Sequence, residues 1–125
     1  MKQIRFYYCK ESRSIMLDLG ESSSQCRSRD LQLLTLNKSE EFADTHTPVM
    51  HFEGGLLKVQ VGERPHSMGP EHYIEWIFVQ TVSGGLFHKM YPGDPPKMTM
   101  HAKQDSVLGV YTYCKEHGLW ASEKN

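Results

Sequence analysis

An apolar, β-rich run between His72 and Val82 constrains the fold of this chain more than any other segment. Ser83-Gly84-Gly85 follows it directly and is typical of a hairpin turn. Residues 86–91 are therefore predicted to return as a neighbouring strand. A long strand joined to the next by a tight turn indicates an antiparallel sheet.

Further strands are predicted on both sides of this hairpin. Leu57, Val59 and Val61 alternate with polar residues, which indicates a half-buried strand that follows a turn at residues 53–55. Residues 97–102 and 107–113 are two more candidates, and the stretch 92–96, with three prolines and a glycine, must be a loop. Short strands with turns at this spacing predict an all-β fold, an antiparallel β-sandwich.

The first 40 residues are more polar and less regular than the rest. Segments 15–19 and 31–36 are candidates for short strands, and residues 37–44 have the composition of a linker. A unit with so few apolar residues usually needs a metal, a disulfide or an oligomer contact. We therefore divide the chain into a small N-terminal domain with its linker, residues 1–40, and a β-sandwich domain, residues 41–125.

The composition argues against several classes of partner. Fourteen Lys and Arg against 15 Asp and Glu give a net charge of −1, so electrostatics provides no reason to expect nucleic acid or an acidic membrane. No apolar stretch has the length of a transmembrane helix, and the first residues do not resemble a signal peptide. Three cysteines without the spacing of a secreted scaffold suit a reducing compartment, so we expect a cytoplasmic protein.

Side chains that can bind a metal gather in three stretches. Cys114 and His117 lie three residues apart, His66 and His72 lie six apart, and His46 stands upstream of both pairs. Thiolate and neutral imidazole together suit iron, copper or zinc, and five donors exceed the four of a structural zinc site. The alternative is a set of unrelated surface or core histidines. The remaining histidines are predicted to be surface residues: His51, His88 and His101.

The sequence around these donors resembles that of a known protein family. The phrases HTPV, VGERPHSMGPEHYIEWI, YPGDPP and YCKEHGLW occur in the order found in the iron-binding domain of superoxide reductases, the desulfoferrodoxins and neelaredoxins. The resemblance covers roughly residues 44–120. It implies an immunoglobulin-like β-sandwich with one mononuclear iron in loops at one end. It also implies the iron ligands: four equatorial histidines, His46, His66, His72 and His117, and the axial Cys114.

The resemblance also implies an enzymatic activity. In the family, ferrous iron with an open sixth position reduces superoxide to hydrogen peroxide without forming dioxygen. An external reductant such as rubredoxin then restores ferrous iron. A thiolate opposite the open position pushes electron density toward the bound oxygen species, as in haem-thiolate enzymes. The backbone N–H groups of Glu116 and His117 are predicted to hydrogen-bond the Cys114 sulfur and so to tune it.

The chain departs from the family pattern directly before the first ligand. Most members have Glu-Lys there, where Lys guides superoxide and Glu ligates ferric iron. In this chain the positions hold Asp44 and Thr45. Thr45 cannot supply a cation, and Asp44 is one methylene shorter than Glu. Lys115, between two predicted ligands, is our first candidate for a substitute cation, with Arg64 and Lys103 as alternatives. The candidate catalytic residues are Asp44, Thr45 and Lys115.

The N-terminal part departs from the family as well. Desulfoferrodoxins bind a second iron with Cys-x-x-Cys and Cys-Cys pairs. Here only Cys9, followed by Lys10-Glu11-Ser12, and Cys26 stand near those positions. Two thiols cannot make a four-cysteine site. The resemblance thus implies a desulforedoxin-like domain that has lost its metal, one iron per chain, and a role for this domain in homodimer formation. In the alternative, Cys9 and Cys26 are ordinary buried thiols.

Two other functions compete with a superoxide reductase. The first is an electron-transfer protein of blue-copper type, which uses two His, one Cys and an axial Met. Met68, Met98 and Met100 raise that possibility, but the surplus of histidines counts against it. The second is a non-catalytic iron-binding or sensing module, whose activity was lost with the missing lysine. Trp76 and Trp120 are predicted to be core residues or walls of the site.

Overall fold

The computed structural model describes residues 4–19 and 28–123. Its contacts divide the chain into two compact units, residues 1–35 and 36–125. The first unit is one antiparallel sheet in the order β2-β1-β3. Its strands are β1 (Arg5–Cys9), β2 (Ser14–Asp18) and β3 (Leu31–Leu33).

The sequence predicted two of these three strands. β2 confirms the strand predicted at 15–19, and β3 is a shorter form of the one predicted at 31–36. β1 was missed, although Phe6 and Tyr7 are buried in it. Cys9 ends β1 as a buried free thiol, whereas Cys26 lies outside the described residues.

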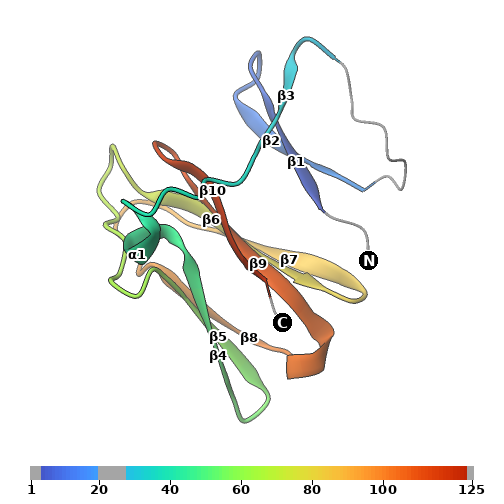
Figure 1. The fold of residues 1–125 in the computed structure, drawn as a ribbon, viewed down its shortest axis with the longest axis vertical. Coiled ribbons are helices and arrows are strands. Elements are labelled where there is room, and N and C mark those ends of the chain that lie inside the picture. The colour runs from blue at the N-terminus through green and yellow to red at the C-terminus, as the bar shows by residue number, and fades with distance from the viewer. Residues whose placement is uncertain (1–3, 20–27, 124–125) are drawn as a thin grey trace. The chain divides into compact units, whose positions relative to one another are not determined.

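The second unit is an all-β sandwich of two sheets (Figure 1). One sheet has the order β10-β9-β6-β7 and the other β4-β5-β8, and neighbouring strands are antiparallel throughout. The elements are α1 (Ala43–His46), β4 (Pro48–Glu53), β5 (Leu56–Val61), β6 (Ile74–Thr81), β7 (Gly84–Lys89), β8 (Lys97–His101), the 3-10 turn η1 (Gln104–Ser106), β9 (Val107–Cys114) and β10 (Gly118–Glu123). No helix in the described parts of the chain is long and apolar enough to cross a membrane.

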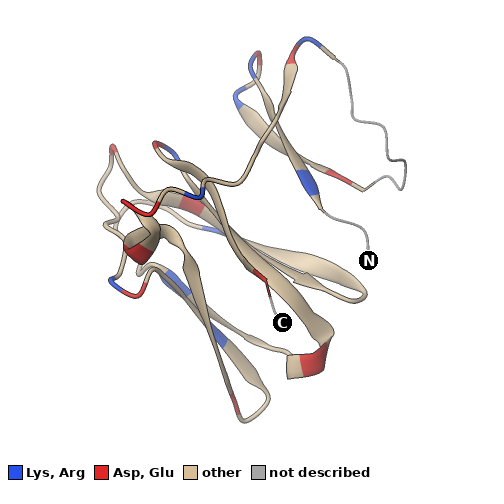
Figure 2. Ribbon diagram, in the orientation of Figure 1, with Lys and Arg blue, Asp and Glu red and all other residues tan. Residues whose placement is uncertain are grey.

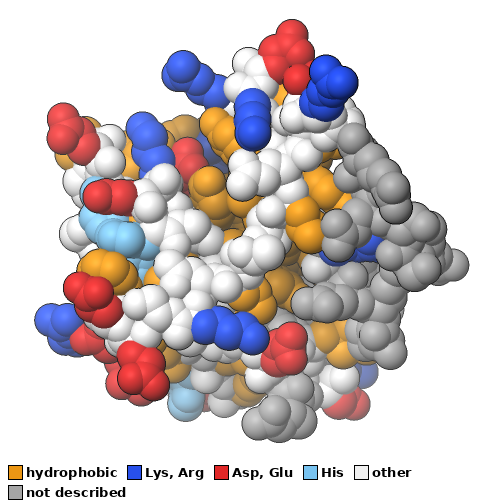
Figure 3. All heavy atoms as spheres, turned by 45° about the horizontal axis from the view of Figure 1, so that its top comes forward, with side chains coloured by type: hydrophobic (Ala, Val, Ile, Leu, Met, Phe, Trp, Pro, Cys, Tyr) orange, Lys and Arg blue, Asp and Glu red, His pale blue; other side chains and the backbone are white. Residues whose placement is uncertain are grey.

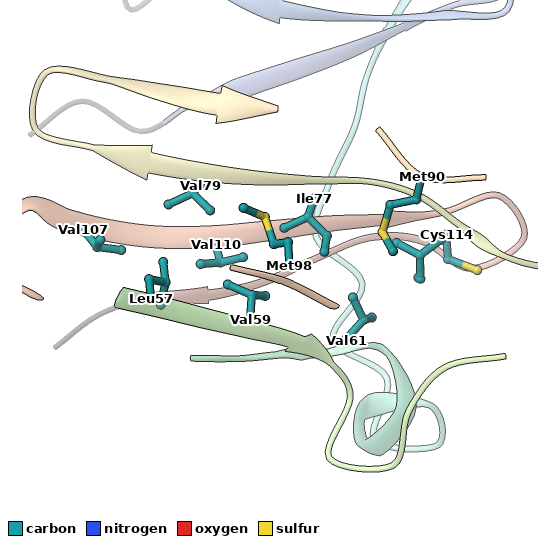
Figure 4. Packing of buried hydrophobic residues seen from close by; sticks show 11 residues of the cluster. Leu57, Val59, Val61, Ile77, Val79, Met90, Met98, Val107, Val110 and Cys114 are labelled. Atoms are coloured by element: carbon teal, nitrogen blue, oxygen red, sulfur yellow. The ribbon is translucent and has the colours of Figure 1, made fainter. Parts of the chain in front are cut away.

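The core lies between the two sheets and follows the alternation of the strands (Figure 4). Leu57, Val59 and Val61 of β5 are fully buried, as their spacing predicted. The facing sheet contributes residues of β6 and β9, among them Ile77, Val79, Val107 and Val110. The last buried residue of this cluster on β9 is Cys114.

A β-bulge at Glu75 sets the direction of side chains near that cysteine. Ile74 pairs with Cys114 and Trp76 with Tyr113, so β6 has one residue more than β9 at this point. The extra residue shifts the alternation, which lets both Ile74 and Ile77 point into the core. The first residue of β6 therefore lies beside Cys114 at one end of the sandwich.

Candidate metal centre

Five potential donors meet at the end of the sandwich where β6, β9 and β10 converge. Cys114 is the last residue of β9, and its backbone pairs with Ile74 of β6 and Gly118 of β10. His117 lies in the turn between β9 and β10. The other three donors are His46 at the end of α1, His66 in the loop after β5, and His72 just before β6. His72 was predicted to open a strand, but β6 begins only at Ile74.

The four imidazoles form a closed ring. The ring centroids of neighbours lie 4.4 Å (His46–His66), 4.6 Å (His66–His72), 5.0 Å (His72–His117) and 4.8 Å (His117–His46) apart. Neighbouring rings are steeply inclined, at 72° to 90°. His46 and His72 stand across the ring, 6.0 Å apart. The arrangement is a square of imidazoles around a common centre.

The donor atoms have the spacing of ligands to one ion. Nε2 of His46 lies 3.0 Å from Nε2 of His66 and 3.1 Å from Nδ1 of His117. Two nitrogens at right angles on a metal, with bonds of about 2.1 Å, would lie about 3.0 Å apart. The Cys114 sulfur lies 3.1 Å from Nε2 of His72 and 3.6 Å from Nε2 of His66. The donor atoms of His46, His72, Cys114 and His117 all lie within 4.8 Å of one another.

Hydrogen bonds on the far side of two rings fix which nitrogen is free. Nδ1 of His46 lies 2.9 Å from the carbonyl oxygen of Phe42, and Nδ1 of His66 lies beside the carbonyl oxygen of Ser67. A carbonyl can only accept, so both Nδ1 atoms carry the proton and both Nε2 atoms present a lone pair. Two such lone pairs facing each other at 3.0 Å repel unless a cation lies between them. The residues present therefore fit a bound metal ion.

Comparison with known proteins agrees with this site. The profile of the family described as desulfoferrodoxin matches residues 38–123. The chain belongs to the desulfoferrodoxin family. The desulfoferrodoxin homolog of Archaeoglobus fulgidus is 32% identical over 123 residues, covering 95% of this chain and 96% of that protein. The desulfoferrodoxin of Nitratidesulfovibrio vulgaris is 31% identical and covers 97% of each chain.

The fold is also similar to that of a solved structure. The superoxide reductase from Treponema pallidum superposes with a TM-score of 0.76 at 28% sequence identity. The match covers 97% of this chain and 98% of that one. The similarity thus extends over both units of the chain.

Burial sets the protonation of the donors at this site. His46 and His66 are 2% and 3% exposed. Burial lowers the pKa of His46 to about 4 and also lowers the pKa of His66, so both are neutral at pH 7 and ready to bind a metal. Burial raises the pKa of the Cys114 thiol, while the backbone N–H groups of His117 and Glu116 lower it. The N–H of His117 lies 3.4 Å from the sulfur, which confirms the predicted hydrogen bond.

Aromatic and polar side chains hold the ligands in place. Phe42 stacks on His117 with ring centroids 4.2 Å apart, and Trp120 lies against His46 at 5.0 Å. The side-chain amide of Asn37 donates to the carbonyl oxygen of His117 at 2.8 Å. Sequence reasoning predicted Trp120 as a wall but missed Phe42 and Asn37. Both lie in the stretch that was predicted to be a linker, and no motif marks them.

The three candidate catalytic residues occupy different surroundings. The Thr45 hydroxyl lies 2.9 Å from Nδ1 of His46, on the side of the ring away from Nε2. The Asp44 carboxylate accepts a hydrogen bond from Nε of Arg64 at 2.7 Å. Lys115 lies in the turn between Cys114 and His117 with an exposed side chain. The histidines predicted at the surface are all exposed: His51, His88 and His101.

Proposed function

We propose that this member of the desulfoferrodoxin family is a superoxide reductase with one mononuclear iron per chain. The ligands would be the five donors described above: His46, His66, His72, His117 and Cys114. The observation that carries the proposal is the square of four imidazole nitrogens with a buried sulfur beside it. The name of the Treponema pallidum structure supports it as well.

The donor set suits iron better than copper or zinc. A blue-copper site needs two His, one Cys and a weak axial Met, whereas four imidazoles gather here. The Met68 sulfur accepts the backbone N–H of Ile74 at 3.4 Å, which indicates a packing role. A structural zinc takes four ligands in a tetrahedron, whereas the donors here are five, four of them in a square.

Bound at this site, iron would supply a Fe²⁺/Fe³⁺ couple and one open coordination position for a small anion. The chain supplies neutral imidazoles and a single thiolate, which leave a formal charge of about +1 on the ferrous centre. That charge would attract a small anion such as superoxide. A thiolate ligand from Cys114 would make the bound iron more electron-rich. The overall reaction converts one superoxide, one electron and two protons into one hydrogen peroxide, and a small electron carrier such as rubredoxin would supply the electron.

The substrate would reach the site from the side of His72 and His117, which are only partly buried. Figure 3 shows imidazole side chains at the surface with acidic side chains beside them. Acidic positions also lie on α1 and in the turns at this end of the sandwich (Figure 2). These acidic side chains would oppose the approach of an anion to the metal, so a cation nearby would have a guiding effect. Lys115 is our candidate, while Asp44 and Thr45 directly precede His46 in sequence.

The remaining assignments concern the whole protein. We propose that the N-terminal unit binds no metal, since Cys9 and Cys26 cannot complete a four-cysteine site. We propose that this unit supports a homodimer. A reducing compartment such as the cytoplasm would keep the Cys114 thiol available for the metal.

Metal analysis combined with an anaerobic pulse of superoxide on the ferrous protein tests the proposal. We expect one iron per chain, rapid oxidation of the ferrous form and formation of peroxide. Cys114→Ser should remove the thiolate-to-iron charge-transfer band and most of the activity, because serine does not ionise at neutral pH. An unchanged oxidised spectrum in that variant, or two irons per chain, would contradict the proposal. Iron binding without turnover would favour a non-catalytic iron-binding or electron-transfer module.

A further inference from the structure

We propose that Arg64 is a positioning residue that draws the Asp44 carboxylate away from the metal. In the same contact Arg64 joins the segment of His46 to the segment of His66. The inference rests on the proposed function, because it requires a metal among the five donors. It assigns to Arg64 a role other than that of a guiding cation.

Asp44 is a carboxylate that stands close to a proposed ligand along the chain. It stands two residues before His46, in the same helical turn. Carboxylate oxygen is a strong ligand for iron, and an open coordination position would invite it. The Asp44 carboxylate instead contacts Arg64, which is not among the five proposed ligands.

A charged hydrogen bond holds the carboxylate elsewhere. Oδ2 of Asp44 accepts from Nε of Arg64 at 2.7 Å, the short distance typical of a charge-assisted bond. The backbone of the same two residues is also joined, since the N–H of Arg64 donates to the carbonyl oxygen of Asp44 at 3.0 Å. Arg64 therefore contacts Asp44 twice, once through its side chain and once through its backbone.

The surrounding backbone keeps the two segments together without the ion pair. The N–H of Gly62 donates to the carbonyl oxygen of Thr47 at 3.0 Å. A Cβ on Gly62 would lie 2.6 Å from the backbone of Thr45, which shows how closely the segments approach. An Arg64→Ala protein keeps both backbone hydrogen bonds and should fold, so that variant isolates the side-chain contact.

The solvent exposure of the two side chains limits how strongly their ion pair can hold the carboxylate. The side chains of Arg64 and Asp44 are 74% and 47% exposed, so solvent screens the pair. Exposed ion pairs shift an equilibrium by only about 1.5- to 5-fold. Arg64 therefore biases the carboxylate between a held and a released state rather than locking it. High salt should weaken the bias, because exposed charges are screened over about 8–10 Å at physiological ionic strength.

The thiolate-to-iron charge-transfer band of the ferric protein tests the inference. Three variants are compared with the native protein: Arg64→Ala, Asp44→Asn and the double variant. An anionic oxygen ligand raises the energy of the iron orbitals that accept the thiolate electron, so its binding moves the band to shorter wavelength. We expect that shift in Arg64→Ala, with up to about a fivefold gain in the carboxylate-bound fraction.

The remaining two variants and a control variant complete the test. Asp44→Asn should have the native band, and the double variant should return to it, because no carboxylate remains to be released. Lys58→Ala is the matched control, since it breaks another exposed pair, Lys58 with Glu53 at 3.5 Å. A band that moves in Asp44→Asn, stays fixed in Arg64→Ala or moves equally in Lys58→Ala would overturn the inference. Absence of any thiolate band in the native protein would instead overturn the proposed function.

Discussion

The two sides of the candidate metal centre are built differently. His46 and His66 are almost fully buried, and the far nitrogen of each ring is bonded to a backbone carbonyl. His72 and His117 are partly exposed, and Nδ1 of His72 faces the exposed carboxylate of Glu116 at 3.9 Å. The buried side is fixed by the fold itself. The exposed side is the one in contact with solvent.

The largest expected effect comes from a substitution at Gly62, where the backbone before His66 packs against the backbone before His46. Gly62 has φ +85°, and a Cβ there would lie 2.4 Å from the carbonyl oxygen of Arg64. We expect Gly62→Ala to lower the free energy of unfolding by about 3 kcal/mol or more, because backbone strain and overlap add. Gly55→Ala is the control, since Gly55 has φ +81° with nothing within 4 Å of its Cβ, and should cost about 1 kcal/mol. Equal losses in urea unfolding would show that the close approach is unimportant.

The second effect is a dependence of stability on pH in the metal-free protein. The pKa of His46 is about 4 in the folded state against 6.5 for an unperturbed His. Below pH 6.5 the unfolded chain takes up a proton that the folded chain refuses, so stability is present above that pH and is lost as pH falls toward 4. The full difference, 2.5 pH units at 1.36 kcal/mol each, is about 3 kcal/mol.

Urea unfolding between pH 7.5 and pH 4 measures that loss. The lowered pKa of His66 should add to it in the same direction. His46→Gln removes the titrating group and should give a flatter curve than the native protein. A native curve as flat as that of the variant would show that burial of His46 does not resist protonation.

The third prediction compares one ligand from each side. His46→Ala should cost the metal-free protein about 2 kcal/mol at pH 8, because a buried ring leaves a cavity. His117→Ala should cost less than about 1 kcal/mol, because its ring is partly exposed. Both variants should lose iron more readily on dialysis against a chelator, and His101→Ala should match the native protein in both measurements. Similar stability losses for the two ligands would remove the distinction between the two sides.

The smallest effect concerns charge at the entrance. Thr45→Lys should speed the second-order reaction with superoxide by about two- to fivefold at low salt, and less at high salt, because an added cation concentrates the anion nearby. Thr45→Val is the control for the lost hydroxyl contact with His46. Lys115→Ala should slow the native protein if Lys115 already serves as the guide. Identical rates in all of these proteins would mean that the centre attracts superoxide unaided.

Much of the sandwich could be predicted from the sequence because its strands alternate or carry long apolar runs. β5, β8 and β9 lie where their patterns placed them, whereas β6 begins at Ile74 instead of His72 and β7 begins at Gly84, inside the turn predicted at 83–85. β10 was missed because it shows no regular alternation of apolar and polar residues, and β4 was missed because its alternation, Met50 and Phe52 against His51 and Glu53, is short. α1 was missed as well, because a single helical turn has too few residues for a period to show.

The donors of the site could be proposed from residue type and from the sequence motifs around them. Their arrangement in space could not be proposed in this way. No sequence pattern reveals that Nδ1 of His117 faces the nitrogens of the other rings while His46, His66 and His72 present Nε2. That choice depends on where each backbone segment ends relative to the others. The pairing of Arg64 with Asp44 was also hidden, because 20 residues separate the two in sequence.

The burial of Cys114 affects how readily the protein would be inactivated by oxidation of its own thiolate. Peroxide oxidises thiolates to sulfenic and then sulfinic acids, and susceptibility follows exposure. A superoxide reductase releases peroxide at the metal that its thiolate binds, so it risks inactivating itself at every turnover. Here the sulfur belongs to a side chain with 0% exposure at the edge of the apolar core, while His72 and His117 stand at the rim. Under the proposed function, peroxide would leave past the partly exposed His72 and His117, whereas the oxidisable sulfur of Cys114 stays buried.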